Sequence, residues 1–192
     1  MIRVFPVAAP TTISNDFGSG RSGGRGHAGN DLFADPDAPL VAVDDGELRS
    51  GVDPLGGNIL NLYSDDGARY YYAHLSWFAL PDGQMTNAPP APRRVRAGDV
   101  VGFLGRTGNA ATTQHHLHFE EHPGRGAAID PFPALDRAPR VEPNQQLGGA
   151  SSRTGTDLSF ARALVLASVG GALVWAAMNP SSARRVVRRL AW

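Results

Sequence analysis

Short segments in which apolar and polar residues alternate dominate the first 133 residues of the chain. Asn58–Tyr63 alternates before the turn sequence Asp65–Gly67, and the aromatic segment Tyr70–Leu75 follows that turn, which predicts a β-hairpin. His116–Glu120 alternates in the same way. No segment before residue 155 has a sustained helical period, so we predict a mainly β domain built from antiparallel strands.

Two further strands are predicted from short apolar runs that end at turn residues. Leu40–Val43 precedes the turn sequence Asp44–Gly46, after which Glu47–Arg49 continues the β pattern, and Val100–Leu104 lies between two glycines. The proline-rich stretch Pro81–Arg96 interrupts this pattern, and we interpret it as a surface excursion.

The C-terminal quarter of the sequence has a different character. We predict a folded domain over residues 4–138, a linker over 139–157 that lacks apolar periodicity, and a basic tail over 181–192. Between the linker and the tail, residues 163–183 carry no charge, and four arginines follow them. This pattern predicts an apolar transmembrane helix over 158–180, since flanking arginines fit the positive-inside rule. The alternative is an apolar helix that docks on the domain or on a partner chain.

Charge and composition narrow the possible chemistry. The chain has 192 residues, a formal net charge of zero and no cysteine, so a disulfide scaffold, a zinc ribbon and a thiol nucleophile are excluded. The net charge of zero is the sum of two oppositely charged parts. Residues 1–150 carry 12 arginines and 17 acidic residues, whereas residues 151–192 carry six arginines and one acidic residue. The acidic body predicts no nucleic-acid partner, and the basic tail suits a membrane surface.

Histidines supply the candidate chemistry. His27 and Asp31 are four residues apart in a glycine-containing segment, and His116 and His118 are two apart in a β segment, so each pair projects from one face. Imidazole and carboxylate groups in this pattern can hold zinc and leave one coordination position for water, which is typical of catalytic rather than structural zinc sites. His122, near the end of the same segment, is interpreted as a surface histidine.

Five stretches of the sequence resemble one family, the lysostaphin-type or LytM-like zinc endopeptidases that cut peptidoglycan peptides. They are similar to the family's motifs in order and in approximate spacing, and the resemblance runs from about residue 12 to residue 131. The stretches are Gly26–Asp31, Pro39–Gly46, Tyr72–Leu75, Gly105–Gly108 and His116–Glu120.

The resemblance implies a fold and a set of roles. The fold would be a compact antiparallel β-sheet peptidase domain of the duplicated hybrid motif type. His27, Asp31 and His118 would bind Zn²⁺, and His74 and His116 would form the catalytic pair beside it. Members that have lost zinc lack some of these residues, whereas this sequence retains all five.

The function predicted from this resemblance is zinc-dependent hydrolysis of peptide bonds in peptidoglycan stem peptides or cross-bridges. Zinc would acidify a water molecule and polarise the scissile carbonyl, while one histidine accepts a proton and the other donates a hydrogen bond to the oxyanion. Glu120 would accept a hydrogen bond from a ligand ring, if the strand is regular.

Three alternatives remain at this stage. The chain could be a non-catalytic peptidoglycan-binding or hydrolase-activating module, a phage- or virion-associated component that carries the same peptidase, or a different zinc hydrolase. The positive-inside rule places the domain outside the membrane, facing the cell wall. Met1–Pro10 resembles no secretory signal, so a domain that stays in the cytoplasm until lysis is the other option.

Overall fold

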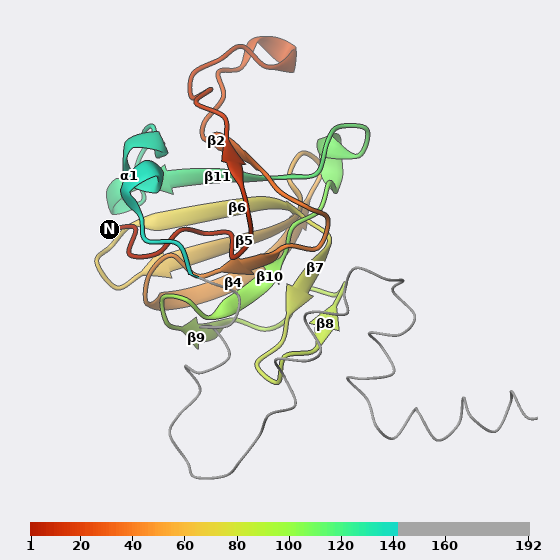
Figure 1. Cartoon of the computed structure of the whole chain (residues 1–192), viewed down its shortest axis with the longest axis vertical. Coiled ribbons are helices and arrows are strands. Elements are labelled where there is room, and N and C mark those ends of the chain that lie inside the picture. The colour runs from red at the N-terminus through yellow and green to blue at the C-terminus, as the bar shows by residue number, and fades with distance from the viewer. Residues whose placement is uncertain (142–192) are drawn as a thin grey trace, which may run out of the picture. The chain divides into compact units, whose positions relative to one another are not determined.

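The computed structural model describes residues 1–141, and this part of the chain is mainly β (Figure 1). A large sheet contains seven strands, and every neighbouring pair in it is antiparallel. In order across the sheet they are β1 (Thr12–Ile13), β2 (Asn30–Phe33), β11 (His116–His122), β6 (Arg69–Leu75), β5 (Gly57–Ser64), β4 (Gly46–Asp53) and β9 (Arg93–Val95).

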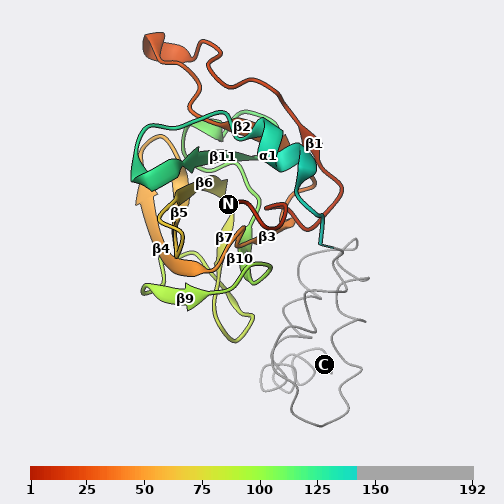
Figure 2. The same cartoon turned by 90° about the vertical axis from the view of Figure 1, so that its left-hand side faces the viewer.

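A smaller antiparallel sheet and a few short helical segments complete the described chain. The order of strands in the small sheet is β3 (Pro39–Val41), β10 (Val100–Phe103), β7 (Trp77–Ala79) and β8 (Met85–Thr86). The helical segments are the 3₁₀ turns η1 (Ser22–Gly24), η2 (Gly108–Ala110) and η3 (Pro123–Arg125) and the α-helix α1 (Phe132–Arg137). Both views place α1 near β11 (Figures 1 and 2).

The predicted strands are confirmed to within a few residues. The hairpin predicted around Asp65–Gly67 is β5–β6, and the alternating segment at His116 is β11. The interpretation of Pro81–Arg96 was incomplete, because this stretch contains β8, which pairs with β7, and the whole of β9, which pairs with β4. Although its middle is exposed, the stretch therefore extends an edge of each sheet.

The register of β11 determines what each face of the large sheet carries. His118 lies opposite Asp31 of β2 on one side and opposite Ala73 of β6 on the other. Leu117 lies opposite Leu32, and both are fully buried. Since successive side chains point to opposite faces, one face contributes to the core and the other presents the polar residues.

The core combines residues of both sheets with the N-terminal segment and α1. Leu40 and Phe78 of the small sheet belong to the same buried cluster as Leu60 and Phe119 of the large sheet. A polar contact also joins the sheets, because the buried hydroxyl of Tyr72 donates to the carbonyl of Val41 at 3.0 Å and accepts from the backbone N–H of Val43 at 3.0 Å. These two hydrogen bonds satisfy the tyrosine hydroxyl, which would otherwise be costly to bury.

The predictions for the C-terminal quarter fall almost entirely beyond the structure. The transmembrane helix at 158–180, the basic tail at 181–192 and the linker from residue 142 onward lie outside the described residues. Within residues 1–141 no helix is long and apolar enough to span a bilayer, since the α-helix there, α1, has six residues.

Candidate metal centre and active site

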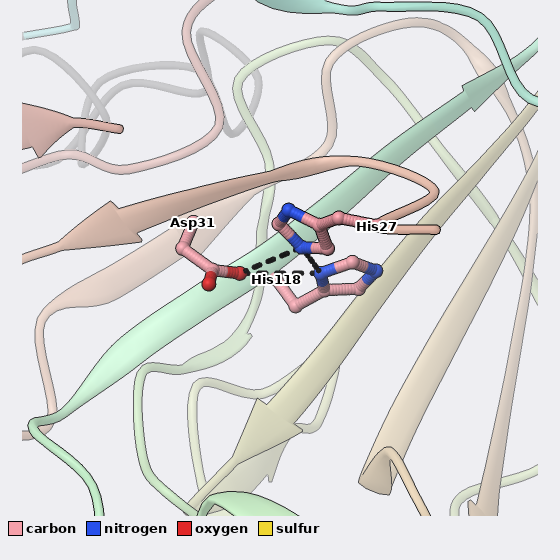
Figure 3. Close-up of side chains that lie close together, drawn as sticks. All are labelled: His27, Asp31 and His118. Atoms are coloured by element: carbon pink, nitrogen blue, oxygen red, sulfur yellow. Dashed lines mark hydrogen bonds and ion pairs between the residues drawn. The ribbon is translucent and has the colours of Figure 1, made fainter. Parts of the chain in front are cut away.

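Three side chains from distant parts of the sequence meet beside β11 (Figure 3). His27 precedes β2, Asp31 lies on β2, and His118 lies on β11. His27 Nε2 is 2.7 Å from His118 Nδ1, and Asp31 Oδ1 is 3.2 Å from each of these nitrogens. Two imidazoles and one carboxylate thus point their donor atoms at one place.

The donor set fits a divalent metal. Imidazole nitrogens and carboxylate oxygens are preferred zinc ligands, and three protein ligands leave a coordination position open. Glu120 Oε1 lies 2.9 Å from His118 Nε2, so this carboxylate accepts a hydrogen bond from Nε2–H. The lone pair of neutral His118 is then on Nδ1, directed toward Asp31 and His27. The predicted hydrogen bond of Glu120 to a ligand ring is therefore present.

Gly29 allows the segment from His27 to Asp31 to lie against β11. A Cβ atom built at Gly29 would collide with the carbonyl group of Phe119. Any larger residue there would push β2 away from β11 and separate Asp31 from His118. The glycine between His27 and Asp31 is therefore required by the close packing of these two strands.

The other two predicted site residues lie next to this cluster. The ring of His74 is 4.9 Å from that of His116 and 6.1 Å from that of His118, measured between centroids. His116 Nε2 is 3.9 Å from Asp31 Oδ1. The structure thus brings all five predicted residues together, and their individual roles stay predictions.

His74 has an unusual backbone conformation that its surroundings hold in place. It lies near the end of β6 with φ of +69°, a left-handed value that is uncommon for a residue other than glycine. Its backbone N–H donates to Gly56 at 2.7 Å, and its Nδ1–H donates to the carbonyl of Thr107 at 2.9 Å. Such strain persists only where many contacts support it, and it clusters at functional sites.

His74 and His116 have the same tautomer. His116 Nδ1 is 2.8 Å from the carbonyl oxygen of Gln114, as His74 Nδ1 is from that of Thr107 at 2.9 Å. Carbonyl oxygens only accept, so each Nδ1 carries a proton. A neutral ring then has its lone pair on Nε2, which is free to accept a proton.

Burial and hydrogen bonding set the charges of the site. Burial together with the neighbouring His116 lowers the pKa of His74 to about 4, so this ring is neutral at pH 7. Burial alone would raise the pKa of Asp31, but hydrogen bonds from His118 and His27 outweigh it and hold that pKa far below its ordinary value. Burial would likewise lower the pKa of His118, yet its bonds to Asp31 and Glu120 raise it to about 9.

The raised pKa of His118 has a simple meaning for cation binding. Without a cation, a second proton on this ring partly compensates the buried carboxylates of Asp31 and Glu120. A metal ion at the same place would displace that proton, which makes metal affinity dependent on pH.

The interpretation of His122 as a surface histidine was wrong. His122 is 7% exposed, and its Nε2 lies 2.6 Å from Glu120 Oε2 and 2.8 Å from Arg69 Nη2. Its Nδ1 donates to the carbonyl of Gly126 at 2.9 Å. The regular alternation of β11 extends beyond Glu120 to His122, and this continuation could have indicated its position.

Two residues at the site were missed entirely. Asp16 and Arg21 precede His27 in an irregular segment and pair with each other. Arg21 contacts Asp31, and Asp16 contacts His27. Neither residue belongs to a periodic segment or to a motif of the lysostaphin-type family, so the sequence offered no signal for them.

Comparisons with known proteins point to one peptidase family. Residues 25–131, more than half of the chain, match peptidase family M23. Glycyl-glycine endopeptidase ALE-1 of Staphylococcus capitis is 34% identical over 121 residues, which are 60% of this chain and 30% of that protein. DD-carboxypeptidase/endopeptidase Mpg of Neisseria meningitidis serogroup B is 30% identical over 139 residues, which are 72% of this chain and 29% of that protein. The chain therefore spans less than a third of the length of these two relatives.

A solved structure shows the same fold. The catalytic domain of the antimicrobial peptidase lysostaphin from Staphylococcus simulans aligns with a TM-score of 0.54 and 30% sequence identity, over 65% of this chain and 92% of that domain. The mainly β, lysostaphin-like fold predicted from the sequence is thus confirmed. The chain belongs to peptidase family M23.

Proposed function

We propose that this chain is a zinc-dependent endopeptidase that hydrolyses peptide bonds in peptidoglycan. The convergence of His27 Nε2, Asp31 Oδ1 and His118 Nδ1 supports this proposal most directly, because these three atoms are of the kinds that zinc prefers and lie beside two further histidines. The relatives described as endopeptidases support the reaction class.

His27, Asp31 and His118 would hold the zinc ion. When bound there, zinc supplies Lewis-acid polarisation of the scissile carbonyl and acidifies a water molecule. Asp31 comes from β2, His118 from β11, and His27 from the segment between η1 and β2. The pairing of β2 with β11 fixes the relative positions of Asp31 and His118.

His74 and His116 would transfer the proton of the attacking water molecule. Each holds its Nδ1 proton on a backbone carbonyl, so each ring can accept a proton from the attacking water at Nε2. Because a neutral ring has no Nε2 proton of its own, the ring that accepts this proton would itself donate a hydrogen bond to the developing oxyanion and then deliver the proton to the leaving amine. This differs from the division of the two roles between the two histidines that the sequence predicted. The low pKa of His74 keeps that ring ready to accept at neutral pH.

The alternative of a non-catalytic peptidoglycan-binding or hydrolase-activating module is not favoured. Such a module would lack part of the donor set, whereas all five side chains are present and face one another in the described part of the chain.

Digestion of purified peptidoglycan by the full-length chain, with mass analysis of the released fragments, tests the proposal and identifies the cleaved bond. We expect His118→Ala to lose both bound zinc and hydrolysis. We expect His116→Ala to keep zinc while turnover falls by about 10²–10⁴-fold, the contribution usual for a general acid–base group. Near-normal hydrolysis by His116→Ala would refute its catalytic role.

The location of the enzyme is proposed from the sequence alone. An apolar span at 158–180 with arginines on its cytoplasmic side would anchor the domain facing the cell wall. Protease treatment of intact spheroplasts tests this, since a domain resistant to external protease would exclude the outward orientation. The proposal would then revert to a domain held in the cytoplasm until lysis or carried by a virion.

A further inference from the structure

The segment before the metal ligands forms a narrow projecting hairpin. The backbone N–H of Gly18 donates to His27, and the N–H of His27 donates to Ser19, both at 2.8 Å. Arg21 N–H donates to Arg25 across the tip at 2.8 Å, with η1 between them. Both views show this segment extending away from the sheets (Figures 1 and 2). Its backbone is therefore held by its own hydrogen bonds, independently of the side chain of Arg21.

The Arg21 side chain reaches from this hairpin to the metal centre. Its Nη2 lies 2.7 Å from Asp31 Oδ2 and 2.6 Å from Asp16 Oδ2. The Asp31 oxygen that Arg21 contacts is not the one that faces His27 and His118, because those nitrogens lie near Oδ1. Arg21 thus fixes the outer oxygen of Asp31 and leaves the inner oxygen available to a metal.

Asp16 supports the two ligand residues of this segment from the same side. Its Oδ1 and its carbonyl oxygen each lie 3.2 Å from His27 Nδ1, and its Oδ1 also accepts from the backbone N–H of Asp31 at 3.4 Å. With Arg21 bound to Oδ2, both oxygens of this carboxylate are occupied.

The position of one proton separates the roles of the two residues. Arg21 Nη2 also lies 2.7 Å from His27 Nδ1, a contact that requires an unprotonated Nδ1. A neutral His27 that gives its Nε2 lone pair to a metal must instead carry its proton on Nδ1. Asp16 can accept a hydrogen bond from that Nδ1–H, whereas the guanidinium of Arg21 can only donate. In the metal-bound centre Arg21 would therefore keep Asp31 and Asp16 and release His27.

We propose that Asp16 and Arg21 are positioning residues of the metal centre, in which Asp16 orients His27 and Arg21 orients Asp31. The inference rests on the proposed function in so far as the centre holds a divalent metal. We call the pair the Asp16–Arg21 clamp. Outer contacts of this kind fix ligand orientation, and their loss commonly costs 10–100-fold in metal affinity.

The sign of the effect distinguishes positioning from simple charge. Arg21 is a cation beside a cation site, so Coulomb repulsion alone predicts tighter metal binding when its charge is removed. Positioning predicts weaker binding, because Asp31 loses the contact that directs its Oδ1. Removal of Asp16 is less decisive, since loss of a negative charge and loss of positioning both weaken binding.

The experiment measures the zinc dissociation constant of the full-length chain by competition with a chromophoric chelator. We expect Arg21→Met to weaken zinc binding by about 10–100-fold. The control Arg25→Met removes the same charge from the same hairpin at an exposed position, and we expect its zinc affinity to stay within about threefold of wild type. Arg21→Lys, which keeps the charge but replaces the guanidinium that makes the Nη2 contacts with an ammonium group, should lie between Arg21→Met and wild type.

The outcomes are separable. Tighter or unchanged binding by Arg21→Met would overturn the clamp, and so would an equal loss in Arg25→Met. A wild-type chain that binds no zinc would instead contradict the proposed function. If Arg21→Met fails to fold, Arg21→Lys decides the same question.

The d–d spectrum of the Co²⁺-substituted protein gives a second measurement, because a misplaced carboxylate changes ligand geometry without unfolding the domain. Addition of Asp16→Asn to Arg21→Met should cost less than the sum of the single changes, as expected for two residues that act through each other.

Discussion

The two faces of the β2–β11 strand pair have different roles, although their side chains come from adjacent positions in the sequence. On one face, Asp31 and His118 lie opposite each other with their donor atoms 3.2 Å apart. On the other, Leu32 and Leu117 are opposite each other and fully buried in the core. A single register produces both arrangements, because a slip of one residue would exchange the faces.

This difference shows how the site obtains its precision. The polar face carries buried charges and gains little stability from being assembled. The apolar face supplies the burial that favours one register, at roughly 25 cal/mol for each Å² of apolar surface removed from water. The geometry of the candidate metal centre is therefore secured by core residues on the opposite face of the sheet.

Substitutions at adjacent positions of β11 give the largest test of this comparison. We expect Phe119→Ala to lower the free energy of unfolding by about 3–5 kcal/mol, since the fully buried ring packs against Tyr70 and Tyr72. His118→Ala should abolish zinc binding but reduce the stability of the metal-free domain by less. Denaturant titration with chelator present measures the free energy of unfolding of both metal-free variants. Phe119→Leu provides a milder variant. Equal destabilisation by the two alanine variants would show that the faces do not act separately.

A glycine near His74 gives a smaller effect that links backbone packing to turnover. Gly108 has φ of +67°, and a Cβ atom there would collide with the backbone of Leu55 and Gly57. We expect Gly108→Ala to cost more than the roughly 1–2 kcal/mol of a left-handed alanine and to reduce turnover, because Thr107, the preceding residue, holds His74.

The matched control for this prediction is Gly124→Ala, since Gly124 has φ of +57° and open space around its Cβ position. It should show the conformational cost alone, with normal turnover in the peptidoglycan assay. If Gly108→Ala kept full activity, the support of His74 by Thr107 would be unnecessary.

Asn30 is an exception on the apolar face and gives the smallest effect. Its side chain is fully buried, and within residues 1–141 neither its amide nitrogen nor its oxygen has a hydrogen-bond partner. Replacement by leucine, which has the same number and branching of side-chain heavy atoms, should raise the free energy of unfolding by about 1 kcal/mol, because an unsatisfied buried amide is destabilising. Thermal unfolding and zinc content measure the change. A loss of stability would reveal a buried water molecule bound to Asn30.

The sequence predicts regular strands well, because alternation is a local property. It therefore identified β11, the β5–β6 hairpin and the common face of His116 and His118. The resemblance to lysostaphin-type enzymes supplied the grouping of all five site residues, since alternation says nothing of which strands are neighbours.

What the sequence did not predict depends on long-range contacts of irregular backbone. The clamp contacts of Asp16 and Arg21 come from a glycine-rich segment whose conformation no periodicity encodes. The left-handed conformation of His74 is set by contacts with Gly56 and Thr107, which are distant in sequence. The pairing of β9 with β4 likewise joins the end of a proline-rich stretch to a strand some 45 residues earlier.

The central place of β11 in the large sheet also decides when the centre can exist during synthesis. β11 is the last strand of the described chain, yet it lies between β2 and β6 and pairs with residues nearly 90 positions earlier. A nascent chain that has emerged only to residue 115 contains His27, Asp31 and His74 but lacks His116 and His118. Non-local pairing of this kind forms late in folding. The candidate centre can therefore assemble only after the whole β domain has been translated.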